Sequence, residues 1–335
     1  MKGKKRNKRT VIGCLIALVA FYAVGGIVMG VQLGQMNKQN AVADNADFGQ
    51  TRLEELNNQG VHVTHSLYTD AETAETPAKA TVKLCCFPNP KEQKSRFVIV
   101  CPGGAYAACA LNEEGYPSAA QLNELGYTAF VLEYRTGENG GEFAAVEDLA
   151  TAVQYVMDHA DEFNVETDNY AVLGYSAGGN LVGLFGTEEN GYKQYGVAKP
   201  SVIFMGYPWC NLNIKSFNPA KMTMYAVLNS TGYKGLIGKD ASAQKKQQMR
   251  IPWQVTENYP ACYMMHGTKD VVVPIKTHTD LLAAALEQNG VLFEYERADG
   301  VNHGCGIGAG TTAKHWLSRA VAFWEEKVLS GTTSQ

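Results

Sequence analysis

The stretch Gly174-Tyr175-Ser176-Ala177-Gly178 places a serine between two glycines. An apolar run at 170–174 precedes the serine and indicates a buried strand, and small residues at 177–184 favour a helix after it. At such a strand-to-helix turn the serine hydroxyl is exposed, and a Cβ at either glycine would collide with the neighbouring strand or helix. The pattern predicts a nucleophilic serine at position 176. Gly, Ser and Ala are common residues, so the prediction depends on partners elsewhere in the chain.

Other short apolar runs alternate with segments of helical periodicity. We expect buried strands at 97–101, 128–134, 170–174, 201–206, 261–266 and 292–298. We expect helices at about 117–125, 143–158, 275–288 and 312–329. This alternation predicts an α/β fold with a mostly parallel central sheet and helices on both faces, preceded by two antiparallel strands at 62–68 and 80–87. Ligands bind such sheets at the carboxyl ends of the strands, so the partners of Ser176 are expected there.

Two loops at those strand ends carry an acid and a base. Asp270 follows the strand expected at 261–266, and His303 lies in a glycine-flanked loop after the last strand. A serine hydroxyl becomes nucleophilic when a histidine, oriented by a carboxylate, accepts its proton. The chain order Ser, Asp, His is typical of this kind of site. Asp299 is a rival acid, but it is only four residues from His303 and fits the same turn.

Six other histidines compete with His303 for the role of base. We expect His266, which ends a strand, to pack near or hold the Asp270 turn. His159, His278 and His315 lie on or at the ends of helices and are expected at the surface. His62 and His65 lie in the early strands.

Acyl transfer also needs hydrogen-bond donors for the developing oxyanion, and losing one costs about 3 kcal/mol of barrier. Gly103-Gly104-Ala105 follows the strand at 97–101. Glycines there leave backbone N–H groups exposed to a substrate, and the N–H of Ala177, the residue after the nucleophile, is the second expected donor. Tyr106 and Trp209 are expected to contact the substrate. Glu113 and Glu114 could also reach it, although acids are common at the start of a helix.

The rest of the composition argues against several classes of site and partner. No C-x-x-C occurs, and the cysteines show no repeated spacing, so we expect neither a zinc site nor a disulfide framework, and no metal or cofactor. The net charge is −4, which gives no indication of a nucleic-acid partner. The sequence does not indicate an oligomeric state.

The N-terminal region predicts attachment to a membrane. Residues 1–10 are strongly basic. Residues 11–34 contain no charged side chain and are mostly apolar, and a helix of this length is long enough to span a bilayer. The basic tail places the N-terminus inside and the rest of the chain outside. An uncleaved signal-anchor is favoured over cleavage after Ala41-Val42-Ala43, because the run is longer than a signal-peptide core.

Beyond that span, the chain divides into a polar segment and a domain. Residues 35–60 are expected to form a polar stalk, and residues 61–332 the domain. The segment 207–259 separates two core strands, and insertions of that length are usually functional, so we expect a lid of a few short helices.

From Phe97 to Trp324 the chain resembles the α/β-hydrolase superfamily, and more narrowly the esterase/lipase-like group that contains bacterial acetyl xylan esterases. The matching motifs are Pro102-Gly103-Gly104-Ala105-Tyr106, Glu114-Gly115-Tyr116-Pro117, Leu125-Gly126-Tyr127, Val131-Leu132-Glu133-Tyr134-Arg135, Asp148, Gly174-Tyr175-Ser176-Ala177-Gly178-Gly179-Asn180, His266-Gly267 with Asp270, and His303-Gly304. The resemblance implies an α/β-hydrolase fold with Ser176 as nucleophile, Asp270 as acid and His303 as base, and with oxyanion donors near Gly104, Ala105 and Ala177. Two positions depart from the family pattern: Ala105 replaces a common third glycine, and Asn180 replaces a common histidine that we expect to pack behind the site.

The function that these expectations favour is a serine esterase on the outer face of a membrane. It would remove short acyl groups, acetyl foremost, from a small ester or an acylated glycan. Two alternatives stay open. A serine peptidase of the prolyl-oligopeptidase type shares the fold and the residue order, although the chain lacks room for a propeller domain. A membrane-tethered module without activity is the other, and a complete Ser–Asp–His set argues against it.

Overall fold

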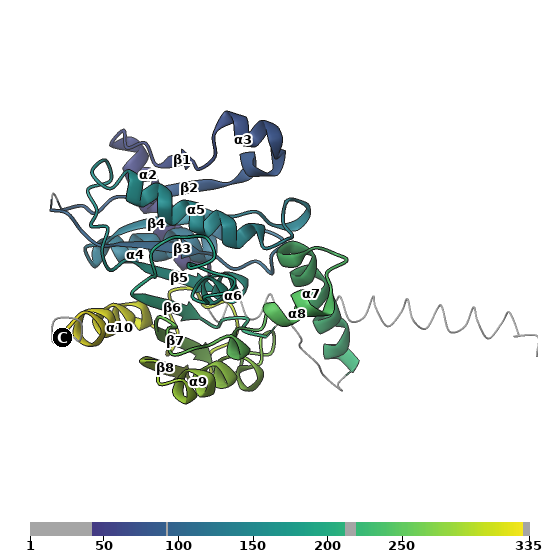
Figure 1. The fold of residues 1–335 in the computed structure, drawn as a ribbon. Helices are drawn as coiled ribbons and strands as arrows, with labels where there is room; N and C mark the ends of the chain where they lie inside the picture. Colours follow the sequence, from purple (N-terminus) through teal and green to yellow (C-terminus); the bar gives the residue numbers. More distant parts are fainter. Residues whose placement is uncertain (1–41, 92, 212–218, 331–335) are drawn as a thin grey trace, which may run out of the picture.

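The computed structural model describes residues 42–91, 93–211 and 219–330. Its centre is one eight-stranded sheet with the strand order β1-β2-β4-β3-β5-β6-β7-β8 (Figure 1). The strands are β1 Thr64–Ser66, β2 Lys83–Phe87, β3 Phe97–Cys101, β4 Thr128–Glu133, β5 Ala171–Tyr175, β6 Val202–Gly206, β7 Ala261–Gly267 and β8 Phe293–Ala298. β2 pairs antiparallel with both β1 and β4, and every other pair is parallel. The prediction of a mostly parallel sheet with an antiparallel start is confirmed.

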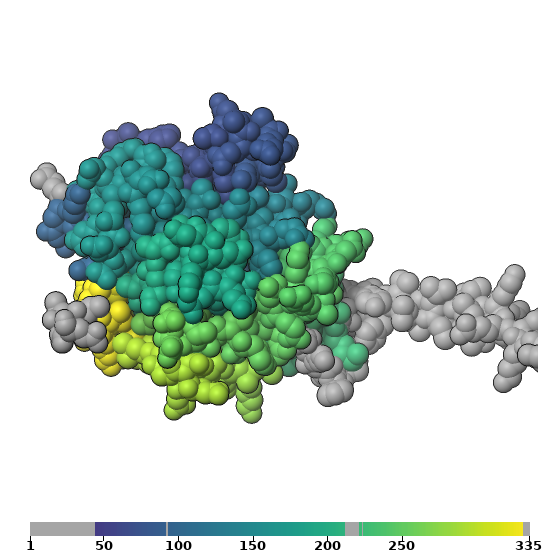
Figure 2. Space-filling model, in the orientation of Figure 1, coloured from purple at the N-terminus to yellow at the C-terminus, as the bar shows by residue number. Residues whose placement is uncertain are grey.

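Helices cover both faces of the sheet because neighbouring side chains of each parallel strand point to opposite sides. On β3, Ile99 packs in the core under α5 (Ala144–Asp158), α6 (Ser176–Phe185) and α9 (Thr279–Gln288). Its neighbours Val98 and Val100 pack in the second core, which α4 (Tyr116–Glu124) and α10 (Trp316–Phe323) cover. Figure 2 shows the N-terminal part of the domain, in purple and blue, at one edge of the molecule, and the yellow-green C-terminal part at the other.

Residues 42–58 differ from the expected stalk. They form helix α2 (Val42–Asn58), which packs against α4. The contact is close, since a Cβ on Gly49 would lie 2.5 Å from the backbone nitrogen of Pro117. Leu56 is 1% exposed and joins the core under α4 and α10. The stalk prediction is wrong for these residues. Their composition is mostly polar, and the few small and apolar residues that contact the domain, such as Gly49 and Leu56, form only a narrow stripe on the helix.

The anchor predicted for residues 11–34 lies outside the described residues. Within residues 42–91, 93–211 and 219–330, no helix combines the length and the apolar character needed to cross a membrane.

The insertion between β6 and β7 contains one long and one short helix, α7 (Pro219–Ile237) and α8 (Ala243–Gln248). They lie side by side at one end of the sheet (Figure 1). The carboxyl end of α7 docks on the loop after β3, where a Cβ on Gly235 would lie 2.2 Å from the carbonyl oxygen of Tyr106. The shorter elements are α3 Asp70–Glu75 and the single turns η1 Pro77–Thr81, η2 Leu111–Gly115, η3 Gly137–Asn139, η4 Ile251–Trp253, η5 Ile275–Thr277 and η6 Trp324–Leu329.

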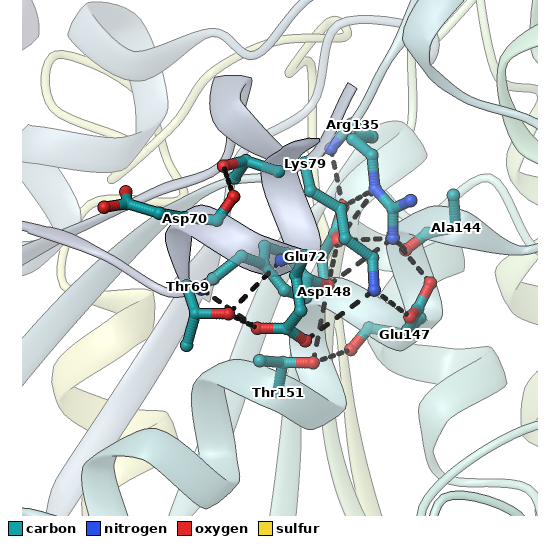
Figure 3. A network of polar contacts seen from close by, with 11 residues as sticks. Thr69, Asp70, Glu72, Lys79, Arg135, Ala144, Glu147, Asp148 and Thr151 are labelled. Atoms are coloured by element: carbon teal, nitrogen blue, oxygen red, sulfur yellow. Dashed lines mark hydrogen bonds and ion pairs between the residues drawn. The ribbon is translucent and has the colours of Figure 1, made fainter. Parts of the chain in front are cut away.

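A buried ion pair joins the end of β4 to α5 (Figure 3). The guanidinium of Arg135 lies 2.7 Å from Asp148, and both side chains are almost fully buried. Asp148 also accepts hydrogen bonds from the backbone N–H of Arg135 at 2.8 Å and from the hydroxyl of Tyr68 at 2.6 Å. Glu147 extends the network outward to Lys79, which lies 3.0 Å away. Arg135 also pairs with Glu147 at 2.7 Å, but Asp148 is its only fully buried carboxylate partner among the described residues. Removing either Arg135 or Asp148 therefore leaves the other buried charge with an incomplete set of partners.

Asp148→Ala is expected to lower the free energy of unfolding by about 3 kcal/mol or more, because it leaves the guanidinium of Arg135 buried without its main partner. Asp161→Ala is the matched control, since Asp161 pairs with Lys94 at 2.7 Å but its side chain is 96% exposed. The control should stay close to wild type because exposed ion pairs contribute little. Urea unfolding followed by circular dichroism compares the proteins, and equal stability of the two variants would contradict the role given to this pair.

Candidate active site

The turn between β5 and α6 has the geometry that the glycines predict. Ser176 has a φ of 49°, an uncommon left-handed conformation for a residue with a side chain. A Cβ on Gly174 would lie 2.2 Å from the carbonyl oxygen of Gly178, and one on Gly178 would lie 2.0 Å from the carbonyl oxygen of Cys101 on β3. Both glycines are therefore required by close contacts between the strand, the helix and the neighbouring strand.

The three residues predicted as a catalytic set form one chain of hydrogen bonds. His303 Nε2 lies 3.0 Å from the Oγ of Ser176, and His303 Nδ1 lies 2.6 Å from the Oδ2 of Asp270. A carboxylate only accepts hydrogen bonds, so Nδ1 carries a proton and donates it to Asp270. In the neutral ring, Nε2 is then free to accept the hydroxyl proton of Ser176. The structure thus brings Ser176, Asp270 and His303 together, and their catalytic roles stay a prediction.

His266 holds the carboxylate of Asp270, as expected from its place at the end of β7. Its Nε2 lies 3.0 Å from Asp270 Oδ2 and 2.9 Å from the carbonyl oxygen of Val273. Both neighbours are acceptors, so Nε2 carries a proton and donates to them. The other oxygen, Oδ1, accepts from the backbone N–H groups of Val272 and Val273 at 2.9 and 2.8 Å. These bonds fix the carboxylate in one orientation beneath His303.

His278 was expected at the surface, and the structure shows this to be wrong. The ring is fully buried at the start of α9, and its Nδ1 accepts the backbone N–H of Asn211 at 3.2 Å. Burial lowers the pKa of His278 to about 3. The imidazole is therefore a neutral packing element that ties the beginning of the insertion to the Asp270 region.

The charges of the set reinforce one another. Burial alone would raise the pKa of Asp270, but the charge of His303 and the hydrogen bonds from His266 and His303 lower it below its ordinary value. Burial alone would lower the pKa of His303, but the charge of Asp270 and their hydrogen bond raise it above its ordinary value, and Glu114 contributes in the same direction. The buried carboxylate is thus held ionised next to an imidazole whose protonated form is stabilised.

The loop after β3 presents the expected backbone donors. Gly104 has a φ of 125° and Ala105 a φ of 55°. In the described part of the chain, neither of their N–H groups donates a hydrogen bond to another protein atom. The N–H of Gly103 does, to the Oε2 of Glu114 at 2.5 Å. Ala177 is the second residue of helix α6, directly after Ser176, in the first turn where the N–H groups of a helix lack intrahelical partners. The oxyanion role of Gly104, Ala105 and Ala177 stays a prediction.

A cavity of about 220 Å³ opens beside the serine. Its lining residues are Gly104, Ala105, Glu114, Ser176, Trp209, Leu228, Val272, Val273 and His303. Polar groups gather at the serine, and Trp209, Leu228, Val272 and Val273 supply the apolar wall. The cavity therefore joins the predicted nucleophile, the base and two predicted oxyanion donors in one space.

The two predicted substrate contacts have different outcomes. Trp209 lines the cavity and is 1% exposed. Tyr106 is fully buried outside the cavity lining, and its hydroxyl donates to the Oδ1 of Asn180 at 2.9 Å. Asn180 in turn donates to the carbonyl of Met249 at 3.1 Å. The prediction for Tyr106 is wrong because its side chain turns into the core behind the loop, and Asn180 packs behind the site as expected.

Sequence reasoning gave little weight to Glu114 and none to Tyr207. Both are buried, and the hydroxyl of Tyr207 donates to the Oε1 of Glu114 at 2.8 Å. The signal for Glu114 was its place in a motif shared with the resembling family, which its position near a helix start obscured. Tyr207 carried no signal, because only the fold brings it next to Glu114. Among the described residues, no group of three or more His, Cys, Asp or Glu side chains is placed to hold a metal ion.

The pKa of His303 is expected to lie above 6.5 when its imidazole nitrogens are titrated by two-dimensional NMR. The measurement uses the Ser176→Ala variant, which lacks the predicted nucleophile. The signal that disappears in His303→Gln is assigned to His303. Because the folded pKa is raised above the unfolded value, protonation of His303 stabilises the fold below pH 6.5, and this contribution is lost as the pH rises through the folded pKa. Asp270→Asn removes the charge that raises this pKa and should shift the titration to lower pH. A titration midpoint below 6.5 in the parent protein would contradict the geometry described above.

Comparison with known proteins agrees with this fold. Residues 85–286, more than half of the chain, match the model of the BD-FAE family. The acetylxylan esterase of Xylanibacter ruminicola is 27% identical over 248 residues, which cover 70% of this chain and 48% of that protein. Esterase LipC of Mycobacterium tuberculosis is 24% identical over 62% of this chain and 52% of its own length. The chain thus spans about half the length of these relatives.

A solved structure is similar over most of its length. The acetyl ester-xyloside bifunctional hydrolase of Caldicellulosiruptor lactoaceticus superposes with a TM-score of 0.65 at 26% identity, covering 78% of this chain and 95% of that one. A truncated carbohydrate esterase from gut microbiota shares the fold with a TM-score of 0.61 at 17% identity, covering 80% of this chain and 95% of that one. The chain belongs to the BD-FAE family and is an esterase/lipase-like α/β-hydrolase similar to acetyl xylan esterases.

Proposed function

We propose that this protein is a serine esterase that hydrolyses short-chain acyl esters, acetyl esters foremost, through an acyl-enzyme. The observation that carries the proposal is the unbroken chain of hydrogen bonds from Ser176 through His303 to Asp270, at the wall of a cavity. The similarity to an acetylxylan esterase and to an acetyl ester-xyloside bifunctional hydrolase supports acetyl esters as the substrate class.

The geometry suits a two-step reaction. In the first step, the Oγ of Ser176 attacks the ester carbonyl carbon as its proton passes to His303 Nε2. The carbonyl oxygen becomes an oxyanion, which the N–H groups of Gly104, Ala105 and Ala177 would stabilise. The intermediate then collapses, the alkoxide leaves with the proton from His303, and an acyl group stays on Ser176. A water molecule, deprotonated by His303, releases the carboxylic acid in the same way.

The size and lining of the cavity support a small acyl group. About 220 Å³ leaves little room beyond the ester itself, and Leu228, Val272 and Val273 offer an apolar surface to a methyl group. Trp209 lines the same cavity, and its buried Nε1–H has no acceptor within the described ranges.

The insertion at 207–259 is proposed to act as the lid. Trp209 and Leu228 both belong to it and both line the cavity. The carboxyl end of α7 rests on the loop at 103–106, which carries two of the predicted oxyanion donors and is called the oxyanion loop below. A Cβ on Gly235 would lie 2.2 Å from the carbonyl oxygen of Tyr106 in that loop. The insertion thus contributes both to the wall of the cavity and to the support of the loop beside it.

Wild-type protein is expected to hydrolyse p-nitrophenyl acetate, and Ser176→Ala should lose at least about a thousandfold in kcat, because no nucleophile remains. A panel of acetylated xylo-oligosaccharides, longer acyl esters and an X-Pro amide then identifies the substrate class. Equal rates of p-nitrophenyl acetate hydrolysis by wild type and Ser176→Ala would contradict the proposal. Cleavage of the amide without ester turnover would favour the peptidase alternative instead.

Leu228→Ala is expected to raise kcat/KM for hexanoate relative to acetate severalfold, because it removes three carbons from the apolar wall. Val227→Ala is the matched control, since Val227 lies next to it on α7, is 52% exposed and is outside the cavity lining. The measurement is the ratio of kcat/KM for the two p-nitrophenyl esters. An unchanged ratio in Leu228→Ala would show that the acyl group binds elsewhere.

We also propose that residues 11–34 anchor the domain on the outer face of a membrane. This proposal rests on sequence alone: the basic residues 1–10, followed by the uncharged apolar run. The full chain should stay with the membrane after carbonate extraction, and the domain should be digested by protease added to whole cells. Release of a mature protein that starts after Ala43 would favour cleavage over anchoring.

A further inference from the structure

We infer that Glu114 and Tyr207 are positioning residues. They fix the position of the oxyanion loop relative to the loop at 303–306, which carries His303. The inference rests on the proposed esterase function. It concerns two side chains that touch neither Ser176 nor Asp270 by any hydrogen bond within the described residues. We call the pair the Glu114–Tyr207 strap.

Glu114 fixes the first of these loops. It lies in η2 (Leu111–Gly115), a single π-helical turn, a rare form that is frequent at functional sites. Its Oε2 accepts the backbone N–H of Gly103 at 2.5 Å. A Cβ on Gly103 would lie 2.8 Å from that same oxygen, so a larger residue there would displace the carboxylate. The N–H of Gly103 is thereby held away from the cavity. The next two N–H groups, those of Gly104 and Ala105, have no acceptor among the described residues, and both residues line the cavity.

Tyr207 fixes the second loop. Its hydroxyl accepts the backbone N–H of Gly306 at 2.8 Å, three residues after His303. Its ring meets the ring of His303 edge to face, with centroids 4.9 Å apart. The backbone of Tyr207 is held in turn, since its φ is 37° and its N–H donates to the carbonyl of Met265 on β7. Tyr207 therefore restrains His303 from both the backbone and the ring side.

The chemistry of the strap requires a carboxylate at one end and a phenol at the other. The Tyr207 oxygen already accepts from Gly306, so its own proton goes to the Oε1 of Glu114. Both oxygens of Glu114 are then acceptors, as only a carboxylate allows. A glutamine would present an NH₂ group to one of two donors and leave one of them unpaired in a buried site.

Electrostatics give the strap a second effect. Glu114 raises the pKa of His303, after the larger contribution of Asp270. Burial raises the pKa of Glu114 itself, against the hydrogen bonds from Gly103 and Tyr207. The titratable groups that face this region are Asp270, His303, Glu113, Tyr207, Tyr175 and Cys305. Because the base must be neutral to accept the proton of Ser176, loss of the Glu114 charge should move the acid limb of activity to lower pH.

The test compares Glu114→Gln, Tyr207→Phe and the double variant, using full-length protein and p-nitrophenyl acetate. Each single change should lower kcat and kcat/KM by the same factor of about ten or more, because a shift of the donors by about 1 Å weakens only the transition state. The double variant should lose no more than the worse single variant, since both changes break one connection. In Glu114→Gln the acid limb of kcat/KM should also move to lower pH.

Tyr170→Phe is the matched control. Tyr170 is equally buried and its hydroxyl donates to the carbonyl of Ala198 at 2.6 Å, outside the cavity lining. It should keep wild-type kcat and the wild-type pH profile even if its melting temperature falls.

Three results would overturn the inference: wild-type rates in both single variants, losses that multiply in the double variant, or a loss of rate with an unmoved acid limb in Glu114→Gln. Absence of ester hydrolysis in wild type would instead reject the proposed function. Circular dichroism melting curves identify variants that fail to fold. If Glu114→Gln does not fold, Tyr207→Phe decides alone, because it preserves the ring and removes only the bridging oxygen.

Discussion

The contact between Gly178 and the end of β3 is the constraint on which the rest of the site depends. No side-chain atom fits between them, so the first turn of α6 lies directly against the carbonyl oxygen of Cys101. The chain leaves β3 from that point into the oxyanion loop, where a Cβ on Gly103 would lie 3.0 Å from the Cβ of Ser176. Two separate strand ends are thus brought together by the absence of side chains. The predicted nucleophile and the predicted oxyanion donors come from different segments, yet backbone contact sets their spacing.

The partners of the serine are held by a different kind of force. Asp270 and His303 sit on loops after β7 and β8, and hydrogen bonds to a buried carboxylate fix their arrangement. Burying an ion is costly unless it is well paired, and here His266, His303 and two backbone N–H groups supply the pairing. Packing positions the serine, and polar contacts position its partners. The Arg135–Asp148 pair repeats this second principle behind the oxyanion loop.

Strand runs and glycine-flanked loops could be predicted from the sequence because their causes are local. Buried parallel strands need apolar residues at every position, as in Phe97–Cys101, and the bounds of β3 agree with the prediction. The antiparallel pairing of β2 and the elbow at Ser176 followed in the same way. Features set by distant contacts could not be predicted. Helix α2 is polar and shows its packing stripe only against α4, His278 is buried by the insertion, and the inward turn of Tyr106 depends on Asn180, 74 residues away.

The docking of α2 has a consequence for how far the domain can reach. In the sequence, seven residues, 35–41, lie between the apolar run that ends at residue 34 and Val42, the first described residue of α2. Fully extended, seven residues span at most about 25 Å. If residues 11–34 cross a bilayer, as proposed above, the start of α2 lies within about that distance of the bilayer. The substrates of the domain would then be limited to esters that approach the membrane surface, which favours soluble oligomers over a rigid, distant polymer.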